Sequence, residues 1–259
     1  MGLIRMIPSP RILRTLCLLC LFGVTSSSSF AEMNARLVLT SDYIYRGLSQ
    51  SSDAVTVQGS LEYQFESGVF VGVWLSQIDY GFDREEDVLP GEYMPYVGSR
   101  IEDNLDFANL EVDYFVGFER RLAKHFAFDV SLVHHDYRGS RGDLDFDWTE
   151  LSVSAYLYDH WIVSLGVADR WLAEKQNTGN VELSYLYPLP LGIIFDVTLG
   201  LQYAEDMIGS TLIYAESGVG RNFGKLSARL AYSALEEGAE EVFGERAENK
   251  WLASLAWSF

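Results

Sequence analysis

Histidines are the first side chains in this sequence to suggest chemistry. Two of its four histidines are adjacent, in the run His134-His135-Asp136. No serine lies two residues after either histidine, so the run lacks a Ser/His arrangement of the kind lipid hydrolases use. Adjacent strand residues point to opposite faces, so the two imidazoles cannot converge without a partner from elsewhere. We predict no catalytic site here and interpret the pair as rim histidines near the end of a strand.

Acidic runs are the second candidate for chemistry. Asp83-Arg84-Glu85-Glu86-Asp87 offers oxygen ligands of the type Ca²⁺ prefers, but it lacks the spacing and the glycine of a defined calcium loop. Glu236-Glu237-Gly238-Ala239-Glu240-Glu241 is similar. We interpret both runs as solvated surface loops. The sequence therefore predicts no metal site, cofactor or catalytic residue.

The first 31 residues have the three parts of a secretory signal peptide. These are a positive start with Arg5, Arg11 and Arg14, an apolar core over residues 12–24, and small residues in Ser29-Phe30-Ala31. A membrane anchor is the alternative, but a spanning helix needs about 20 apolar residues and this core is shorter. We expect residues 1–31 to be cleaved, leaving residues 32–259 as a single domain.

Charge and cysteine usage narrow the possible partners. The chain has 19 Lys+Arg and 37 Asp+Glu; loss of three arginines with the signal leaves 16 against 37, a net charge of −21. Both cysteines also lie in the predicted signal, so the mature chain would contain no disulfide. Such a negative chain is not expected to bind nucleic acid.

The rest of the chain alternates between apolar and polar residues. Residues 193–203 place isoleucine, phenylalanine, valine, leucine and tyrosine on one face, with aspartate, threonine and glutamine on the other. Residues 110–118 and 126–132 repeat the pattern. Soluble β-sandwiches also alternate, but their strands run about 5–6 residues. These segments run about 9–12 residues, the length needed to cross a bilayer at a tilt.

Twelve such segments are predicted, joined by connections that alternate between short and long. The segments are 35–46, 54–65, 69–79, 107–119, 125–137, 148–158, 161–173, 180–187, 193–204, 211–222, 225–234 and 249–259. Outer-membrane barrels have short periplasmic turns, longer extracellular loops and an even number of strands. The fold class predicted is therefore all-β, an antiparallel transmembrane β-barrel of about 12 strands.

The final segment and the aromatic residues agree with this fold. Alternate positions from Trp251 to Phe259 are apolar, and a terminal aromatic resembles the signature read by the barrel assembly machinery. Aromatic residues near segment ends would form interfacial girdles. They are Tyr43, Tyr45, Tyr63, Trp161, Trp171, Tyr185, Tyr187, Tyr203, Tyr232 and Trp257.

A more specific resemblance covers roughly residues 37–80. Residues 39–50 read LTSDYIYRGLSQ, and residues 66–79 read ESGVFVGVWLSQID. Together they resemble the N-terminal hallmark of the TorF-like porins, a proteobacterial outer-membrane family. The resemblance implies a barrel and a passive pore. It supplies no catalytic residue or substrate.

The polar faces of the predicted strands would place charged side chains inside the barrel. They are Arg36, Asp42, Arg46, Glu62, Glu111, Asp113, Glu119, Asp129, Glu150, Arg170, Glu182, Asp196, Glu216, Arg229 and Lys250. Acids outnumber bases in this set, so not every acid can be paired. Asp42 and Arg46 lie on one face near the end of a predicted strand, and we interpret them as a structural salt-bridge network. The inward aromatics would be Trp74, Phe115, Tyr156, Tyr158 and Tyr214.

We predict an outer-membrane channel for passive diffusion of small solutes, narrow and cation-leaning. Its partners would be outer-membrane lipid, lipopolysaccharide and the assembly machinery. A barrel of about eight strands is filled by its side chains, whereas 16–18 strands leave a channel. The second loop, residues 80–106, could constrict a 12-stranded pore. A lipid-modifying enzyme and a closed structural or adhesive barrel remain as alternatives. Inward aromatics packed into a plug would favour the closed barrel.

Overall fold

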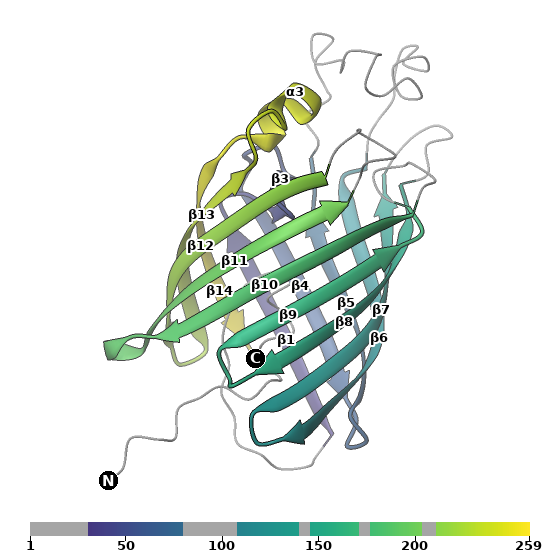
Figure 1. The fold of residues 1–259 in the computed structure, drawn as a ribbon, viewed down its shortest axis with the longest axis vertical. Helices are drawn as coiled ribbons and strands as arrows, with labels where there is room; N and C mark the ends of the chain where they lie inside the picture. The colour runs from purple at the N-terminus through teal and green to yellow at the C-terminus, as the bar shows by residue number, and fades with distance from the viewer. Residues whose placement is uncertain (1–30, 80–107, 140–145, 171–176, 204–210) are drawn as a thin grey trace.

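The computed structural model describes residues 31–79, 108–139, 146–170, 177–203 and 211–259, which form a closed antiparallel β-barrel (Figure 1). Twelve strands make up the wall, each paired with its neighbour in the chain, and β1 closes the ring against β14. The predicted fold class and strand number are confirmed. Among the described residues, no helix is long and apolar enough to cross a membrane.

The wall strands match the alternating segments closely. They are β1 (Glu32–Thr40), β4 (Thr56–Gln64), β5 (Val69–Gln77), β6 (Leu110–Ala123), β7 (Phe126–Arg138), β8 (Trp148–Leu157), β9 (Trp161–Ala168), β10 (Thr178–Pro188), β11 (Ile193–Tyr203), β12 (Thr211–Phe223), β13 (Leu226–Leu235) and β14 (Lys250–Ser258). Two-residue strands β2 (Ile44–Tyr45) and β3 (Leu48–Ser49) form a separate sheet. Short helical turns are η2 (Pro190–Gly192), α3 (Glu240–Phe243) and η3 (Gly244–Ala247).

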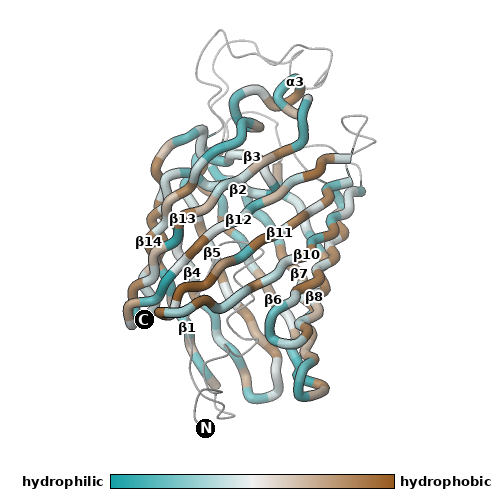
Figure 2. Tube along the Cα trace, turned by 60° about the vertical axis from the view of Figure 1, so that its left-hand side comes forward, coloured by the Kyte–Doolittle hydropathy of each residue, from teal (hydrophilic) through white to brown (hydrophobic). Residues whose placement is uncertain are grey.

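Alternation along each strand separates two surfaces. On β1, Leu37 and Leu39 are 49% and 46% exposed on the outer face, while Val38 and Thr40 are buried. Brown and teal segments follow one another along the strands in Figure 2 for the same reason. Because the ring is closed, none of the described wall strands leaves an unpaired edge, and a wall with an apolar outer face suits a lipid environment.

Most of the predicted girdle aromatics lie on the outer face. Side chains at least 38% exposed are Tyr63, Trp161, Tyr187, Tyr203, Tyr232 and Trp257. Tyr185 is half-buried, and Trp171 lies outside the described residues. Tyr43 and Tyr45 were wrongly assigned to the girdle. They are 1% and 8% exposed and lie inside the barrel, because the first strand ends earlier than predicted.

The predicted signal peptide, residues 1–31, lies outside the described residues except for Ala31, so its cleavage stays a prediction. The second loop, residues 80–106, and its acidic run also lie outside them, so its predicted place in the pore stays a prediction. The acidic run over residues 236–241 is described: Ala239 is buried, and Glu237, Glu240 and Glu241 are exposed.

The closing seam between β1 and β14 gives the first prediction. Val38 and Ala256 are directly opposite, both point inward, and both are buried. Opposite residues in antiparallel strands have Cα atoms about 4.5–5.5 Å apart, within the range of about 4.4–6.8 Å for disulfides. In a chain with Cys17→Ser and Cys20→Ser, the pair Val38→Cys and Ala256→Cys should oxidise to a disulfide. The circularised chain would migrate faster than the reduced chain on a denaturing gel.

Val38→Cys with Ser254→Cys is the matched control, because Ser254 pairs with Thr40 and is two residues out of register. Its Cα should lie about 7–8 Å from that of residue 38, too far for a disulfide without movement of the strands. Equal cross-linking of the two pairs, or none in the first, would contradict the closed seam.

Candidate functional site

The barrel interior is the candidate site, and every predicted pore-lining residue is among the described ones. The buried members are Asp42, Glu111, Asp113, Glu119, Asp129 and Asp196. The half-buried members are Arg46, Glu62, Arg170, Glu182, Glu216 and Arg229. Arg170 lies just beyond the end of β9, and Asp42 and Arg46 are not on a wall strand. A role in lining a water-filled pore stays a prediction for the whole set.

The first correction concerns the start of the barrel. The predicted strand 35–46 ends at Thr40, and the chain then turns into a small hairpin made of β2 and β3, residues 44–49, which we name the plug hairpin. Its two-residue turn, Arg46-Gly47, has φ values of 51° and 85°. Two positive φ values define the type I′ turn, whose twist suits a tight hairpin. The alternating pattern was extended through residue 46, so this turn was not predicted from the sequence.

The plug hairpin packs inside the barrel, enclosed by the wall, at the end that carries the long loops. Tyr43 just before the hairpin meets Trp74 of β5 edge to face, with ring centroids 5.3 Å apart. Tyr45 lies against Trp148 of β8 at 6.2 Å. Leu48 is completely buried, and Arg246 from the last loop donates from Nε to the Ser49 carbonyl oxygen at 2.9 Å. The hairpin is therefore held both by aromatic side chains of the wall strands and by Arg246 of the last loop.

Arg46 anchors the turn of the plug hairpin to the wall. Its guanidinium donates to both carboxylate oxygens of Glu150 on β8, at 2.7 and 2.9 Å. It also donates to Gln202 Oε1 on β11 at 2.9 Å. The side chains of Arg46 and Glu150 are 9% and 8% exposed. Glu150 was predicted to point inward, but its pairing with Arg46 was missed because the hairpin was missed.

Asp42 has different partners from those predicted. Its Oδ1 accepts hydrogen bonds from Ser49 and Ser51 at 2.7 and 2.6 Å, and Lys250 Nζ lies 3.5 Å from its Oδ2. Burial raises the pKa of the Asp42 carboxyl, against the lowering effect of these hydrogen bonds and of Lys250. No contact between Asp42 and Arg46 is found among the described residues. Each instead ties the hairpin region to another element.

Elsewhere in the barrel interior, arginine and tyrosine side chains partner the acids. Arg229 on β13 pairs with Asp196 of β11 and, at 2.8 Å, with Glu216 of β12. Tyrosine hydroxyls donate to two other acids: Tyr214 to Glu182 at 2.7 Å, and Tyr156 to Asp129 at 2.5 Å. These contacts pair interior carboxylates with polar groups and lower the cost of burying charge.

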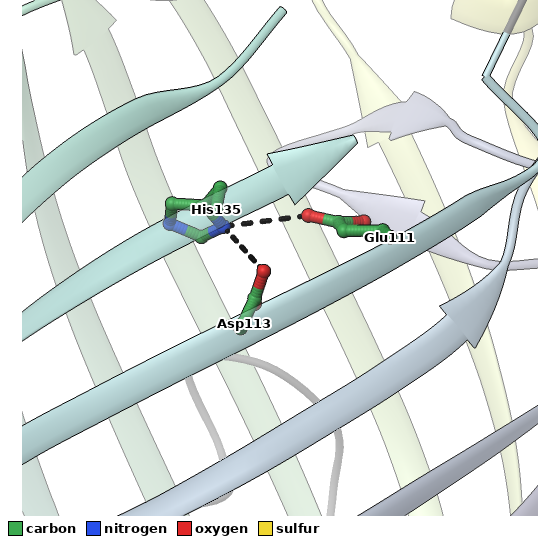
Figure 3. A group of neighbouring side chains, drawn as sticks. All are labelled: Glu111, Asp113 and His135. Carbon is green, nitrogen blue, oxygen red and sulfur yellow. Dashed lines mark hydrogen bonds and ion pairs between the residues drawn. The ribbon is translucent and has the colours of Figure 1, made fainter. Parts of the chain in front are cut away.

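Three other side chains meet on the β6–β7 hairpin (Figure 3). His135 Nδ1 lies 2.9 Å from Asp113 Oδ1 and 3.3 Å from Glu111 Oε1. His134 points to the opposite, exposed side, as expected for adjacent strand residues. His135 lies near the end of β7, as predicted, but its side chain is buried inside the barrel rather than exposed at an open rim. It is 2% exposed. It lies six residues after Asp129 on the same strand and therefore on the same face. Because Asp129 was predicted to point inward, the sequence could have predicted the same for His135.

The inward aromatics are mostly as predicted. Trp74, Tyr156 and Tyr214 are 5% exposed and Phe115 packs against the buried cluster, so all four lie inside. The prediction that Tyr158 points inward was wrong. Its side chain is 66% exposed, because it lies in the turn after β8 with a φ of 53° rather than on the strand. A positive φ ends the alternation on which the prediction rested.

A closed wall, apolar outside and filled with charged groups inside, places the protein in the porin-like class of β-barrels. The chain belongs to the family described as "Bacterial protein of unknown function (Gcw_chp)", whose model matches residues 24–241. The resemblance to TorF-like porins stays a prediction. No curated protein matches the chain.

Solved structures match most of this chain at low sequence identity. A protein from the work "Unveiling the Mechanism Behind the in-meso Crystallization of Membrane Proteins" is 11% identical, with 88% of this chain and 83% of that chain covered and a TM-score of 0.51. KdgM porin is 7% identical over 88% of this chain and 98% of its own, with a TM-score of 0.48. An outer membrane channel from Pseudomonas putida F1 is 11% identical over 90% and 96%, with a TM-score of 0.48.

The second prediction tests the anchor of the plug hairpin. Arg46→Ala leaves the Glu150 carboxylate buried without its cation, and breaking a buried pair in this way costs about 3–5 kcal/mol. The free energy of unfolding in urea should fall by roughly that amount. Adding Glu150→Gln should restore a large part of it, because the uncompensated charge is gone. A loss in the double variant as large as in the single variant would contradict the pairing.

Proposed function

We propose that this protein is an outer-membrane channel for passive diffusion of small solutes, narrow and cation-leaning. The observation that supports the proposal most is the charged interior of a closed barrel with an apolar outer wall. Burying charge in a dry interior is costly, so the number of interior carboxylates favours a lumen that holds water. Water and mobile cations in the lumen would lower that cost.

Narrowness is supported by the plug hairpin, which lies within the wall at the end with the long loops. Its aromatic and aliphatic side chains pack against Trp74, Trp148 and Tyr214 and take up space that an open pore would need. Solutes would have to pass beside the hairpin or wait for it to move. The channel proposed here therefore has a low conductance.

Cation preference is supported by the acids that keep contact with the lumen. Glu62, Glu182 and Glu216 are half-buried on β4, β10 and β12. Fixed carboxylates around a narrow passage concentrate cations and repel anions, as rings of acidic residues do in cation channels. At about 4 Å, two charges interact by about 1 kcal/mol in water and about 4 kcal/mol near a protein surface. A few carboxylates are enough for severalfold discrimination.

A closed barrel is the second candidate, and one observation favours it. Tyr43, Tyr45, Trp74 and Trp148 pack together with Tyr214 into a continuous aromatic plug. Such a barrel would act through its loops rather than through a lumen. The two candidates differ in one property: only the channel conducts while the plug hairpin is intact.

Outer-membrane lipid and lipopolysaccharide would surround the wall. The assembly machinery would read the last strand, where Phe259 is 64% exposed and its backbone N–H donates to Ala35.

The third prediction tests the channel in planar bilayers under a KCl gradient, with EDTA present. The wild-type barrel should conduct, and its reversal potential should have the sign of cation preference. Neutralising Glu62, Glu182 and Glu216 to glutamine should reduce the preference severalfold, because the accessible fixed charge is removed.

Glu237→Gln, at an exposed position of the last loop, is the matched control and should keep the wild-type reversal potential. A folded wild-type barrel with no conductance would favour the closed barrel. An anion-selective wild type would defeat the cation preference alone.

A further inference from the structure

Strand register brings three ligand-type side chains together inside the barrel. Asp113 of β6 is directly opposite His135 of β7, and Glu111 is directly opposite Tyr137. Residues two apart on a strand share a face, so Glu111 and Asp113 both point inward toward the same histidine. The β6–β7 pairing alone therefore builds a cluster of two carboxylates and one imidazole.

Distances within the cluster suit a shared ion (Figure 3). His135 Nδ1 lies 2.9 Å from Asp113 Oδ1 and 3.3 Å from Glu111 Oε1, and one ligand atom from each residue lies within 4.8 Å of the others. Nitrogen and oxygen ligands lie about 2.0–2.2 Å from Zn²⁺, which at tetrahedral angles puts neighbouring ligand atoms about 3.4 Å apart. Small side-chain movements would bring the three atoms to that separation.

Among the described residues, His135 is the one basic side chain within ion-pair distance of the two carboxylates. Glu111, Asp113 and His135 are 2%, 0% and 2% exposed. Among the described residues, Glu111 Oε2 and Asp113 Oδ2 have no hydrogen-bond partner, and no lysine or arginine lies within ion-pair distance of either carboxylate. The nearby Arg46 is engaged by Glu150. One imidazole faces two buried carboxylates, and buried charge that is not fully paired is costly, so a bound cation would stabilise the cluster.

Neighbouring side chains hold the ligand groups in place. The Trp148 ring stacks on the His135 imidazole, with centroids 3.8 Å apart and planes at 10°. Tyr137 donates from its hydroxyl to Glu111 Oε1 at 3.0 Å. Outer contacts of this kind orient metal ligands in proteins. Tyr45 of the plug hairpin packs 6.3 Å from the histidine ring, so the cluster adjoins the plug.

We propose that Glu111, Asp113 and His135 bind one divalent transition-metal ion, such as Zn²⁺. An imidazole with two carboxylates suits Zn²⁺ and its neighbours, whereas Ca²⁺ takes about 6–8 oxygen ligands. The ion would supply the positive charge that the two acids lack. It would also tie β6 to β7 beside the plug hairpin. The site does not depend on whether the barrel conducts.

Zinc binding to the refolded full chain tests the proposal directly. The chain carries Cys17→Ser and Cys20→Ser to remove thiol ligands, and its metal is stripped with EDTA. Titration against a chromophoric zinc chelator should give one equivalent of Zn²⁺ per chain. His135→Ala should weaken binding by at least about tenfold, the lower end of what loss of even an outer contact costs. Asp113→Asn, which preserves side-chain shape, should do the same.

His134→Ala is the matched control, because this neighbouring histidine lies on the exposed outer face and should leave binding unchanged. Folding of each variant is checked by the mobility of the unheated barrel on a gel. Absence of stoichiometric zinc in the wild type would overturn the proposal, leaving His135 as a plain ion-pair partner. Equal losses in His134→Ala and His135→Ala, or wild-type binding in folded Asp113→Asn, would overturn it as well.

Discussion

Every second side chain of a closed sheet must find its partners inside the barrel, and here many of those side chains are carboxylates. Arg229 serves two acids at once, and tyrosine hydroxyls serve Asp129 and Glu182. Arg46 reaches from the plug hairpin to satisfy Glu150. The polar interior and the position of the plug are therefore consequences of one requirement, the pairing of buried charge.

The plug hairpin depends on a backbone conformation that has a cost. Arg46 has a positive φ of 51°, which is uncommon for a residue other than glycine. Gly47 follows with a φ of 85°, and a Cβ there would lie 2.7 Å from Leu235 Cδ1 and 2.9 Å from Tyr214 Cβ. The ion pair of Arg46 offsets the strain, so turn, charge and packing stabilise one another at the mouth of the barrel.

Wall strands could be predicted from the sequence because period-2 alternation is a local property. For eleven of the twelve strands, most of the predicted ends lie within a few residues of the observed ones. The site could be predicted only in part. A β-bulge between Arg121 and Ala123 lengthens β6, so the turn is shorter than expected and the register that places Asp113 opposite His135 could not be derived. The plug hairpin was missed because residues 35–46 were assigned to one alternating strand, and its contact with Glu150, 104 residues from Arg46, could not be derived from local pattern.

Single-channel conductance of a chain whose plug hairpin, residues 44–49, is replaced by a Gly-Ser segment of equal length tests the account most directly. The hairpin packs at the mouth through contacts of Tyr45, Arg46 and Leu48 and is not part of the closed ring of wall strands. The same chain carries Glu150→Gln, which removes the carboxylate that the loss of Arg46 would leave unpaired. The account predicts a folded barrel with a clearly larger conductance than the wild type. An unchanged conductance in a folded variant would contradict the claim that this hairpin limits the lumen.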